Sequence, residues 1–483
     1  MSESTYDESG GSGTRSVRWS AIGLAGRQGL GILFSLILAN ILGPESFGII
    51  AQATVYMSLT SLLLDQGISA ALISAKSVNR RLAGAATTLN LLLALVLGAS
   101  TLVFASPVAA FFSTPELVHV LWVLGLCLWL KALAVVPRML AARSMTFRSQ
   151  AVADISGTLA GGALALFGAS QGWGYWSLVW QVVAADIVIA ALLIIFIRPP
   201  LPNAHIRLLR DTLGFSSKVL AGNFVSYTVQ NIDTIVIGRF MSSLSVAYYS
   251  LAYKVLTTPV QMIGQVVTRV LFPAISRARH RGQAIAPLIF RSAQSISLAS
   301  FPLMALIAVS SSDSVPLILG EEWLPVIPIL TIFAVSGARQ SITTINTSVM
   351  MGMGRADITL RFSFLAGAVQ ITGILIGLQF GIIGVASGFT LAGFVLTPVI
   401  CYLQKKIAGF GYRQQILSVW PALHASAWGA GGYAAFALTT VPPIVHLIVG
   451  GTIFVAVYVL ALRGFHRSTF SSGLRNVRSI LGT

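Results

Sequence analysis

Apolar segments of about 20 residues recur along almost the whole chain, from Val17 to Arg463. Only 9% of the residues are charged, compared with roughly 25% in an average soluble domain. A helix rises about 1.5 Å per residue, so each segment is long enough to cross a hydrocarbon core of about 30 Å. Backbone groups in lipid must form their hydrogen bonds within the segment, which requires helices. The sequence therefore predicts an all-α, polytopic membrane protein.

We predict about 14 transmembrane helices from these segments. They cover residues 18–42, 47–75, 82–106, 117–137, 150–168, 173–197, 212–238, 244–272, 287–310, 324–350, 359–378, 382–403, 417–438 and 443–462. Residues 1–17 are polar and contain no basic, apolar and small-residue regions in the order of a cleaved signal peptide. We expect them to form a disordered cytoplasmic tail.

Basic residues orient these helices. With the N-terminus in the cytoplasm, 23 of the 31 Lys and Arg residues fall in cytoplasmic loops and tails, and Arg239 alone falls in an outer loop. This asymmetry predicts a multi-pass membrane protein with both termini in the cytoplasm. It also accounts for the net charge of +17 through topology and anionic headgroups, so a nucleic-acid partner is not expected.

The pattern of the predicted helices repeats after the sixth helix. We predict an N-terminal six-helix lobe at residues 18–197, a basic cytoplasmic linker at 198–211 and a C-terminal six-helix lobe at 212–403. Two additional transmembrane helices follow at 404–463, and a basic cytoplasmic tail at 464–483. Two such lobes are expected to enclose a central cavity.

Charged residues inside the predicted helices carry the functional signal, which is strongest in the polar stripe of the predicted helix 244–272. Each costs at least about 2.5–3.5 kcal/mol near the middle of a membrane, so it normally faces a partner or a wet cavity. The seven bases are Arg27, Lys131, Lys218, Lys254, Arg269, Arg291 and Arg339, and the four acids are Asp65, Asp154, Asp186 and Asp233. Three positive charges remain after the acids are subtracted, which favours an anionic ligand.

Helical periodicity gathers several of these charges into polar stripes. The residues predicted to bind substrate are Arg27, Lys218, Lys254, Gln261, Gln265, Arg269 and Arg339; those predicted to couple transport or to form ion pairs are Asp65, Asp186 and Asp233. Two alternatives stay open. Ser, Thr and Gly stripes also serve as helix-packing surfaces, and estimated depths favour the pairs Arg27–Asp65 and Asp233–Lys254.

Patterns typical of enzymes, metal sites and nucleotide-driven pumps are missing from the sequence. Cys127 and Cys401 fall inside separate predicted helices, and the six His residues show no ligand spacing. No Walker loop, CxxC, HExxH or GxSxG arrangement is present. We therefore expect no catalytic residue, no metal and no cofactor, and a protein that is not an enzyme.

Several short motifs resemble the polysaccharide-transporter branch, the O-antigen and exopolysaccharide flippases of Wzx type, of the multidrug, oligosaccharidyl-lipid and polysaccharide exporter superfamily. They lie at residues 42–50 (LGPESFGII), 65–67 (DQG), 70–73 (AALI), 231–240 (NIDTIVIGRF), 248–250 (YYS) and 269–276 (RVLFPAIS). The resemblance covers residues 18–463, and the order and spacing of the motifs carry it.

This resemblance implies a flippase that moves an undecaprenyl-pyrophosphate-linked oligosaccharide from the cytoplasmic to the outer leaflet by alternating access through a cationic cavity. Its partners would be membrane lipids, the lipid-linked saccharide, H⁺ or Na⁺ as coupling ion, and a polysaccharide polymerase or glycosyltransferases. Arginines in the first and eighth helices are a feature of related lipid flippases, and Arg27 and Arg269 match them by helix.

Two other functions fit parts of the pattern. A cation-coupled multidrug antiporter of related architecture would depend on Asp65, Asp186 and Asp233 rather than on the bases. A membrane polysaccharide polymerase would need catalytic residues in a large outer loop. The longest predicted outer loop, residues 311–323, offers only Asp313, Glu321 and Glu322.

Overall fold

The computed structural model describes residues 13–74, 78–205, 227 and 231–471. All regular elements in these ranges are helices, which confirms the predicted all-α class. Internal packing divides the chain into two compact units, Met1–Ala247 and Tyr248–Thr483, and each is described by itself. The predicted boundaries of the lobes, the linker and the two C-terminal helices remain a prediction.

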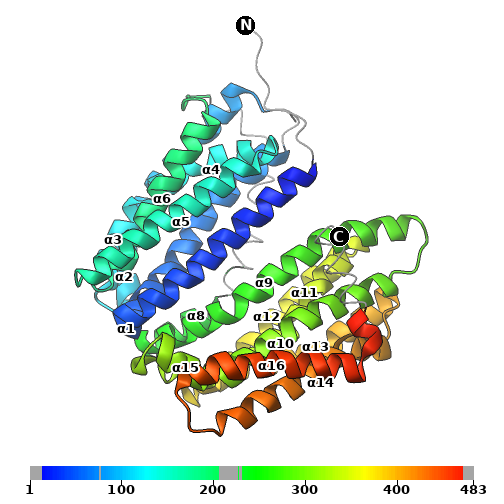
Figure 1. Ribbon diagram of the computed structural model, residues 1–483. Coiled ribbons are helices and arrows are strands. Elements are labelled where there is room, and N and C mark those ends of the chain that lie inside the picture. Colours follow the sequence, from blue (N-terminus) through cyan, green and yellow to red (C-terminus); the bar gives the residue numbers. More distant parts are fainter. Residues whose placement is uncertain (1–12, 75–77, 206–226, 228–230, 472–483) are drawn as a thin grey trace. The chain divides into compact units, whose positions relative to one another are not determined.

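Unit 1 is built from helices that pack against one another (Figure 1). They are α1 Gly13–Ser74, α2 Arg80–Phe112, α3 Leu117–Leu126, α4 Leu128–Arg143, α5 Phe147–Ser170, α6 Trp176–Ile197 and α8 Ile232–Phe240. The core of this unit lies among α1, α2, α3, α4 and α6, where Leu64, Leu121 and Leu128 are completely buried.

Two of the predicted membrane helices meet inside α1. Gly43 has φ 70° and ψ 173°, a conformation that glycine adopts without the penalty a side chain incurs. Pro44 follows and cannot donate a backbone hydrogen bond. The helix therefore breaks between the predicted ranges 18–42 and 47–75. A second break of 40° at Cys127 separates α3 from α4, within the predicted range 117–137.

Unit 2 contains α9 Ser243–His280, whose first residues belong to unit 1, and the rest of the chain (Figure 1). The remaining elements are α10 Ala286–Ile318, the short η2 Glu321–Trp323, α11 Val326–Gly352, α12 Ala356–Leu378, α13 Gly381–Ala408, α14 Tyr412–Ala437, α15 Pro443–Val445, η3 His446–Gly450 and α16 Gly451–Phe465.

The last helices of unit 2 are attached to α10 by buried polar contacts. Tyr433 on α14 donates a hydrogen bond of 2.7 Å to Oδ2 of Asp313 on α10. Nδ1 of His446 lies 3.3 Å from Oδ1 of the same carboxylate, and Nε2 lies 3.0 Å from the carbonyl of Thr439. Tyr458 on α16 donates to the carbonyl of Leu298 at 2.9 Å. These contacts fix the C-terminal helices to the body of unit 2.

Within the described ranges, nine helices are long and apolar enough to cross a membrane, and α3 with α4 makes a tenth if the bent pair is one span. Because α1 contains two of the predicted spans, the number of membrane crossings is larger than the number of these helices. The predicted span 212–238 lies mostly outside the described residues. The arrangement is that of a multi-pass membrane protein.

Candidate functional site

A pair of opposite charges faces a pocket inside unit 1. Nζ of Lys131 on α4 lies 4.0 Å from Oδ2 of Asp186 on α6, and the two side chains are 30% and 18% exposed. The same ammonium donates a hydrogen bond of 3.3 Å to Oγ of Ser61 on α1. Three helices that are distant in the sequence thus bring an acid, a base and a hydroxyl to one place.

The pocket around this pair has a volume of about 200 Å³. It is lined by Ile50, Thr54, Met57, Ser58, Leu124, Cys127, Lys131, Leu178, Val179, Val182 and Asp186. Ligand pockets of drug-sized molecules measure roughly 300–1,000 Å³, whereas a water molecule takes about 30 Å³ in the liquid. The pocket suits water and a small ion, and it is too small for a lipid-linked saccharide.

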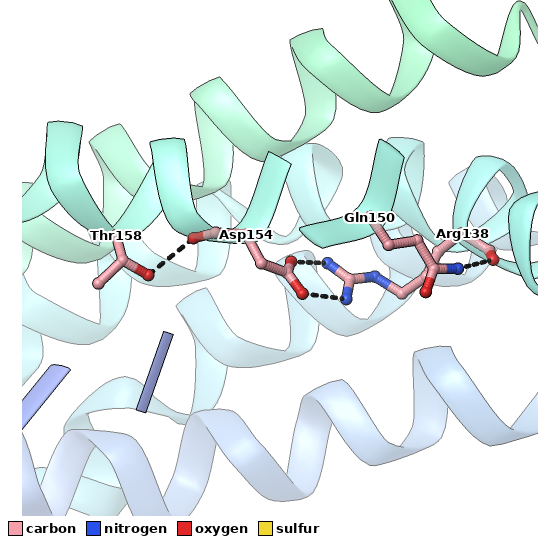
Figure 2. Close-up of polar contacts among 4 residues, drawn as sticks. All are labelled: Arg138, Gln150, Asp154 and Thr158. Atoms are coloured by element: carbon pink, nitrogen blue, oxygen red, sulfur yellow. Dashed lines mark hydrogen bonds and ion pairs between the residues drawn. The ribbon is translucent and has the colours of Figure 1, made fainter. Parts of the chain in front are cut away.

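A second charge pair in unit 1 joins α4 to α5 (Figure 2). Nη2 of Arg138 lies 2.8 Å from Oδ1 of Asp154, and Nη1 lies 3.3 Å from Oδ2. The amide of Gln150 donates to the carbonyl of Arg138 at 2.6 Å, and Thr158 donates to the carbonyl of Asp154 at 2.8 Å. A two-pronged guanidinium–carboxylate contact of this kind has well-defined geometry, so the pair is structural.

These two pairs change the charge balance expected from the sequence. Asp154 is neutralised by Arg138, a base that the predicted topology places in a cytoplasmic loop and outside the seven intramembrane bases. Asp186 is paired with Lys131. Asp154 therefore neutralises none of the seven intramembrane bases. The excess of these bases over the acids that can neutralise them becomes larger.

Among the predicted substrate-binding bases, Arg339 on α11 is the one whose surroundings the structure describes most fully. Its guanidinium lies 5.8 Å from the ring centroid of Phe394 on α13 and packs directly against Gly393. Among the described residues it has no ion pair with an acid, and its Nε atom is buried without a hydrogen-bond partner. Arg339 is thus held between two helices by packing rather than by a counter-charge.

Helix α9 carries the predicted polar stripe on its more accessible side. Tyr249, Leu256 and Val260 are buried, whereas Gln261 is exposed. The buried side packs into an aromatic cluster, in which the ring centroids of Tyr253 and Phe389 lie 5.9 Å apart. Thr258 on the polar face is 5% exposed, so only part of that face is accessible.

The other predicted site residues are described to different extents. Arg27 is exposed on α1, and Lys254 lies on α9. Asp233 is 3% exposed, and its Oδ1 accepts a hydrogen bond of 2.7 Å from the backbone of Thr234. Lys218 and the side chains of Asp65, Gln265 and Arg269 lie outside the described residues. The pairs Arg27–Asp65 and Asp233–Lys254 stay predictions, the second because its members belong to different units.

Sequence reasoning did not anticipate the partner of Lys131 or the role of Arg138. Lys131 and Asp186 are 55 residues apart in the sequence, and periodicity does not say which helices are neighbours. For Arg138 a signal was available. The short turn between α4 and α5 makes these helices antiparallel, so residues at similar distances from the turn, such as Arg138 and Asp154, come close together.

Comparisons with solved structures place the fold among polytopic membrane transporters. It is similar to lipid II flippase MurJ in an inward closed conformation, with a TM-score of 0.76, 16% identity and coverage of 93% of this chain and 99% of that one. It is also similar to an inward-facing multidrug resistance MATE family transporter of the MOP superfamily, with a TM-score of 0.61, 16% identity and coverage of 81% and 98%.

The sequence profile of the polysaccharide biosynthesis proteins matches residues 37–328, and the chain belongs to this family. It is 27% identical to the lipopolysaccharide biosynthesis protein WzxC of Escherichia coli over 417 residues, 83% of each chain. It is 26% identical to the succinoglycan biosynthesis transport protein ExoT of Rhizobium meliloti over 324 residues, 67% of this chain and 66% of ExoT. The resemblance to the polysaccharide-transporter branch is thereby confirmed.

Proposed function

We propose that this protein is a flippase that moves a polyprenyl-pyrophosphate-linked oligosaccharide from the cytoplasmic to the outer leaflet of a bacterial membrane. The names of the relatives support this cargo, because they refer to lipopolysaccharide, to succinoglycan transport and, for the structural neighbour, to lipid II. Undecaprenyl as the lipid carrier and alternating access through a cationic cavity are parts of the same proposal.

The observation that carries the proposal is the positive charge that remains inside helices. Arg339 has no acidic partner among the described residues, and the structural pairs of unit 1 use their acids for Arg138 and Lys131. A guanidinium or ammonium attracts phosphate oxygens. The proposed cargo-binding residues are Arg27, Lys218, Lys254, Gln261, Gln265, Arg269 and Arg339.

The pocket of Lys131 and Asp186 has a different proposed role. Its volume suits an ion or water and not the cargo, so we assign it to the coupling of transport to H⁺ or Na⁺. Protonation of Asp186 would break its attraction to Lys131 and change the contact between α4 and α6. Asp65 and Asp233 are the other acids proposed to take part in coupling or ion pairing.

A transport assay with purified protein tests the cargo. The protein is reconstituted in vesicles with a fluorescent polyprenyl-pyrophosphate saccharide, and the fraction of the saccharide exposed on each leaflet is followed over time. We expect flipping by the wild type and its loss in the triple variant Lys254→Ala, Arg269→Ala, Arg339→Ala. Arg291→Ala, which removes an exposed base of α10, is the control. Unchanged flipping in the triple variant, at equal reconstitution, would remove the proposed cargo site.

The alternative is a cation-coupled multidrug antiporter, which is favoured by the similarity to the MATE transporter. It requires that Asp65, Asp186 and Asp233, rather than the bases, dominate the activity. Drug accumulation is measured in cells that express the wild type, the Asp→Asn variants and the triple variant. Drug efflux that depends on the acids and not on the bases would favour the antiporter.

A further inference from the structure

Arg339 presents an unusual environment for a cation. The guanidinium lies against Gly393 and near the face of the Phe394 ring. Burying a charge is costly unless it is paired and hydrogen-bonded, and a cation–π contact supplies only part of that compensation. The side chain forms no ion pair with any acid that the structure describes, and its Nε atom is buried without an acceptor. Arg339 is half-buried, and an anion in place of a protein carboxylate would balance its charge.

Two buried hydroxyls on the same two helices, α11 and α13, also have no hydrogen-bond partner. Oγ of Ser336 on α11 and Oγ1 of Thr390 on α13 are both in this state, and the two residues are 0% and 6% exposed. Nearly all buried polar groups in proteins have a partner, so each exception calls for an explanation. Three buried donors without an acceptor occur together on only two helices.

The packing of α11 on α13 brings these donors together. The chain reverses at Gly354 (φ 69°) and again at Gly381 (φ 70°), so α11 and α13 run in the same direction. Arg339 touches Gly393. Ser336 lies one turn before Arg339 on the same side of α11, and Thr390 lies one turn before Gly393 on the same side of α13. The two hydroxyls are therefore at matching heights in the same helix interface.

We propose that Arg339, Ser336 and Thr390 form a binding site for a small monovalent anion such as chloride. The guanidinium is positively charged and can only donate hydrogen bonds, and both hydroxyls can donate as well. This set of groups suits an anion, because a metal cation would be repelled by the guanidinium. The nearly complete burial of the hydroxyls favours an ion of a single atom over a phosphate that carries a lipid and a sugar.

This inference goes beyond the proposed flipping and does not depend on the cargo. The bound anion neutralises Arg339 and joins α11 to α13 through shared hydrogen bonds. Arg339 remains a proposed cargo-binding residue, and the small anion occupies it when no cargo is bound. An anion requirement would then persist whatever molecule the protein transports.

The test measures the thermal unfolding of the purified full-length protein while chloride replaces gluconate at constant ionic strength. We expect the unfolding temperature of the wild type to rise with chloride and to reach a plateau. Arg339→Gln should abolish the chloride response and unfold at a higher temperature than the wild type in gluconate, because it removes an uncompensated charge. The control Arg291→Gln, at an exposed base of α10, should respond to chloride like the wild type.

A second variant keeps the test decisive if Arg339→Gln does not fold. Ser336→Ala with Thr390→Val retains the charge and removes both hydroxyls, and we expect it to raise the half-saturating chloride concentration about tenfold or more. An equal response to chloride and gluconate in the wild type overturns the proposal, as does a chloride response in Arg339→Gln. If inorganic pyrophosphate stabilises the wild type through Arg339 and chloride does not, the site binds a phosphate headgroup and the small-anion proposal is wrong.

Discussion

Arg138 on α4 and Asp154 on α5 form a two-pronged ion pair, with Nη2 at 2.8 Å from Oδ1 and Nη1 at 3.3 Å from Oδ2 (Figure 2). The side chains are 32% and 14% exposed, so both charges are partly removed from water. Gln150 fixes the backbone of Arg138 through a further hydrogen bond of 2.6 Å. The pair holds two neighbouring helices of unit 1 in register.

Asp154→Asn should therefore destabilise the protein without changing its cargo. The asparagine can accept only one hydrogen bond from the guanidinium and leaves the positive charge of Arg138 uncompensated, at a cost of about 2 kcal/mol. Thermal unfolding of the purified protein measures the loss. The control is Asp357→Asn, which breaks a pair with Arg355 in which both side chains are 51% exposed, and pairs of that kind contribute little. Equal unfolding temperatures for the two variants would contradict a structural role of Asp154.

The pocket in unit 1 yields a prediction about coupling. Asp186→Asn removes the group that can exchange a proton or attract a cation, so flipping in vesicles should no longer respond to an imposed gradient of H⁺ or Na⁺. Lys131→Met should alter the ion dependence while cargo binding persists. Ser61→Ala removes only the hydrogen bond to Lys131 and is the matched control. The coupling role fails if Asp186→Asn responds to both gradients like the wild type.

The elements of the fold could be predicted from the sequence because lipid imposes strict lengths on helices. The break at Gly43 and Pro44 was visible as a gap between two apolar segments, and the structure places it there. The length of an apolar segment does not indicate, however, which helices pack against each other. The contact of Lys131 with Asp186 depends on α4 packing beside α6, and that of Arg339 with Gly393 depends on α11 packing beside α13.

Helical periodicity similarly predicted which residues share a face of one helix, but not which helices pack against each other. It placed Gln261 and the neighbouring polar residues on one side of α9, and the buried Tyr249 and Leu256 on the other side agree with that division. It could not find the acceptor-free hydroxyls of Ser336 and Thr390, because these become unusual only when two helices bury them together.

Glycines at the interface of α12 and α13 provide a test of packing. Gly373 and Gly388 face each other, as do Gly377 and Gly384, and a Cβ atom added to Gly388 would collide with the backbone carbonyl of Gly373. Small residues at such positions let helices approach closely. Because backbone cannot move aside as a side chain can, Gly388→Ala should cost about 1–3 kcal/mol.

Thermal unfolding and the yield of folded protein in detergent measure this effect. The control is Gly431→Ala on α14, where an added Cβ atom meets no atom within 4 Å. That variant should be as stable as the wild type or more stable, since alanine lowers the entropic cost of the helix. A Gly388→Ala protein with the stability of Gly431→Ala would show that α12 and α13 are not held together by this close approach.

The end of α16 supplies a prediction about pH. Nε2 of His466, the residue after α16, lies 3.3 Å from Nδ1 of His424 on α14. Burial lowers the pKa of His466 from its ordinary value of 6.5, and the neighbouring His424 lowers this pKa further. The folded protein thus binds a proton at His466 at a lower pH than the unfolded chain does. Between the lowered pKa of His466 and its ordinary value, the unfolded state binds more protons than the folded state, so stability rises with pH in this range.

Stability should accordingly decrease as the pH falls below about 6.5, and it should level off once the pH is below the lowered pKa of His466. In His466→Gln this part of the pH dependence should disappear, because glutamine can keep a hydrogen bond to His424 and does not titrate. Unfolding temperatures between neutral and mildly acidic pH measure the difference in slope. His280→Gln, at an exposed position at the end of α9, should keep the slope of the wild type. A His466→Gln slope equal to that of the wild type would mean that protonation elsewhere controls stability in acid.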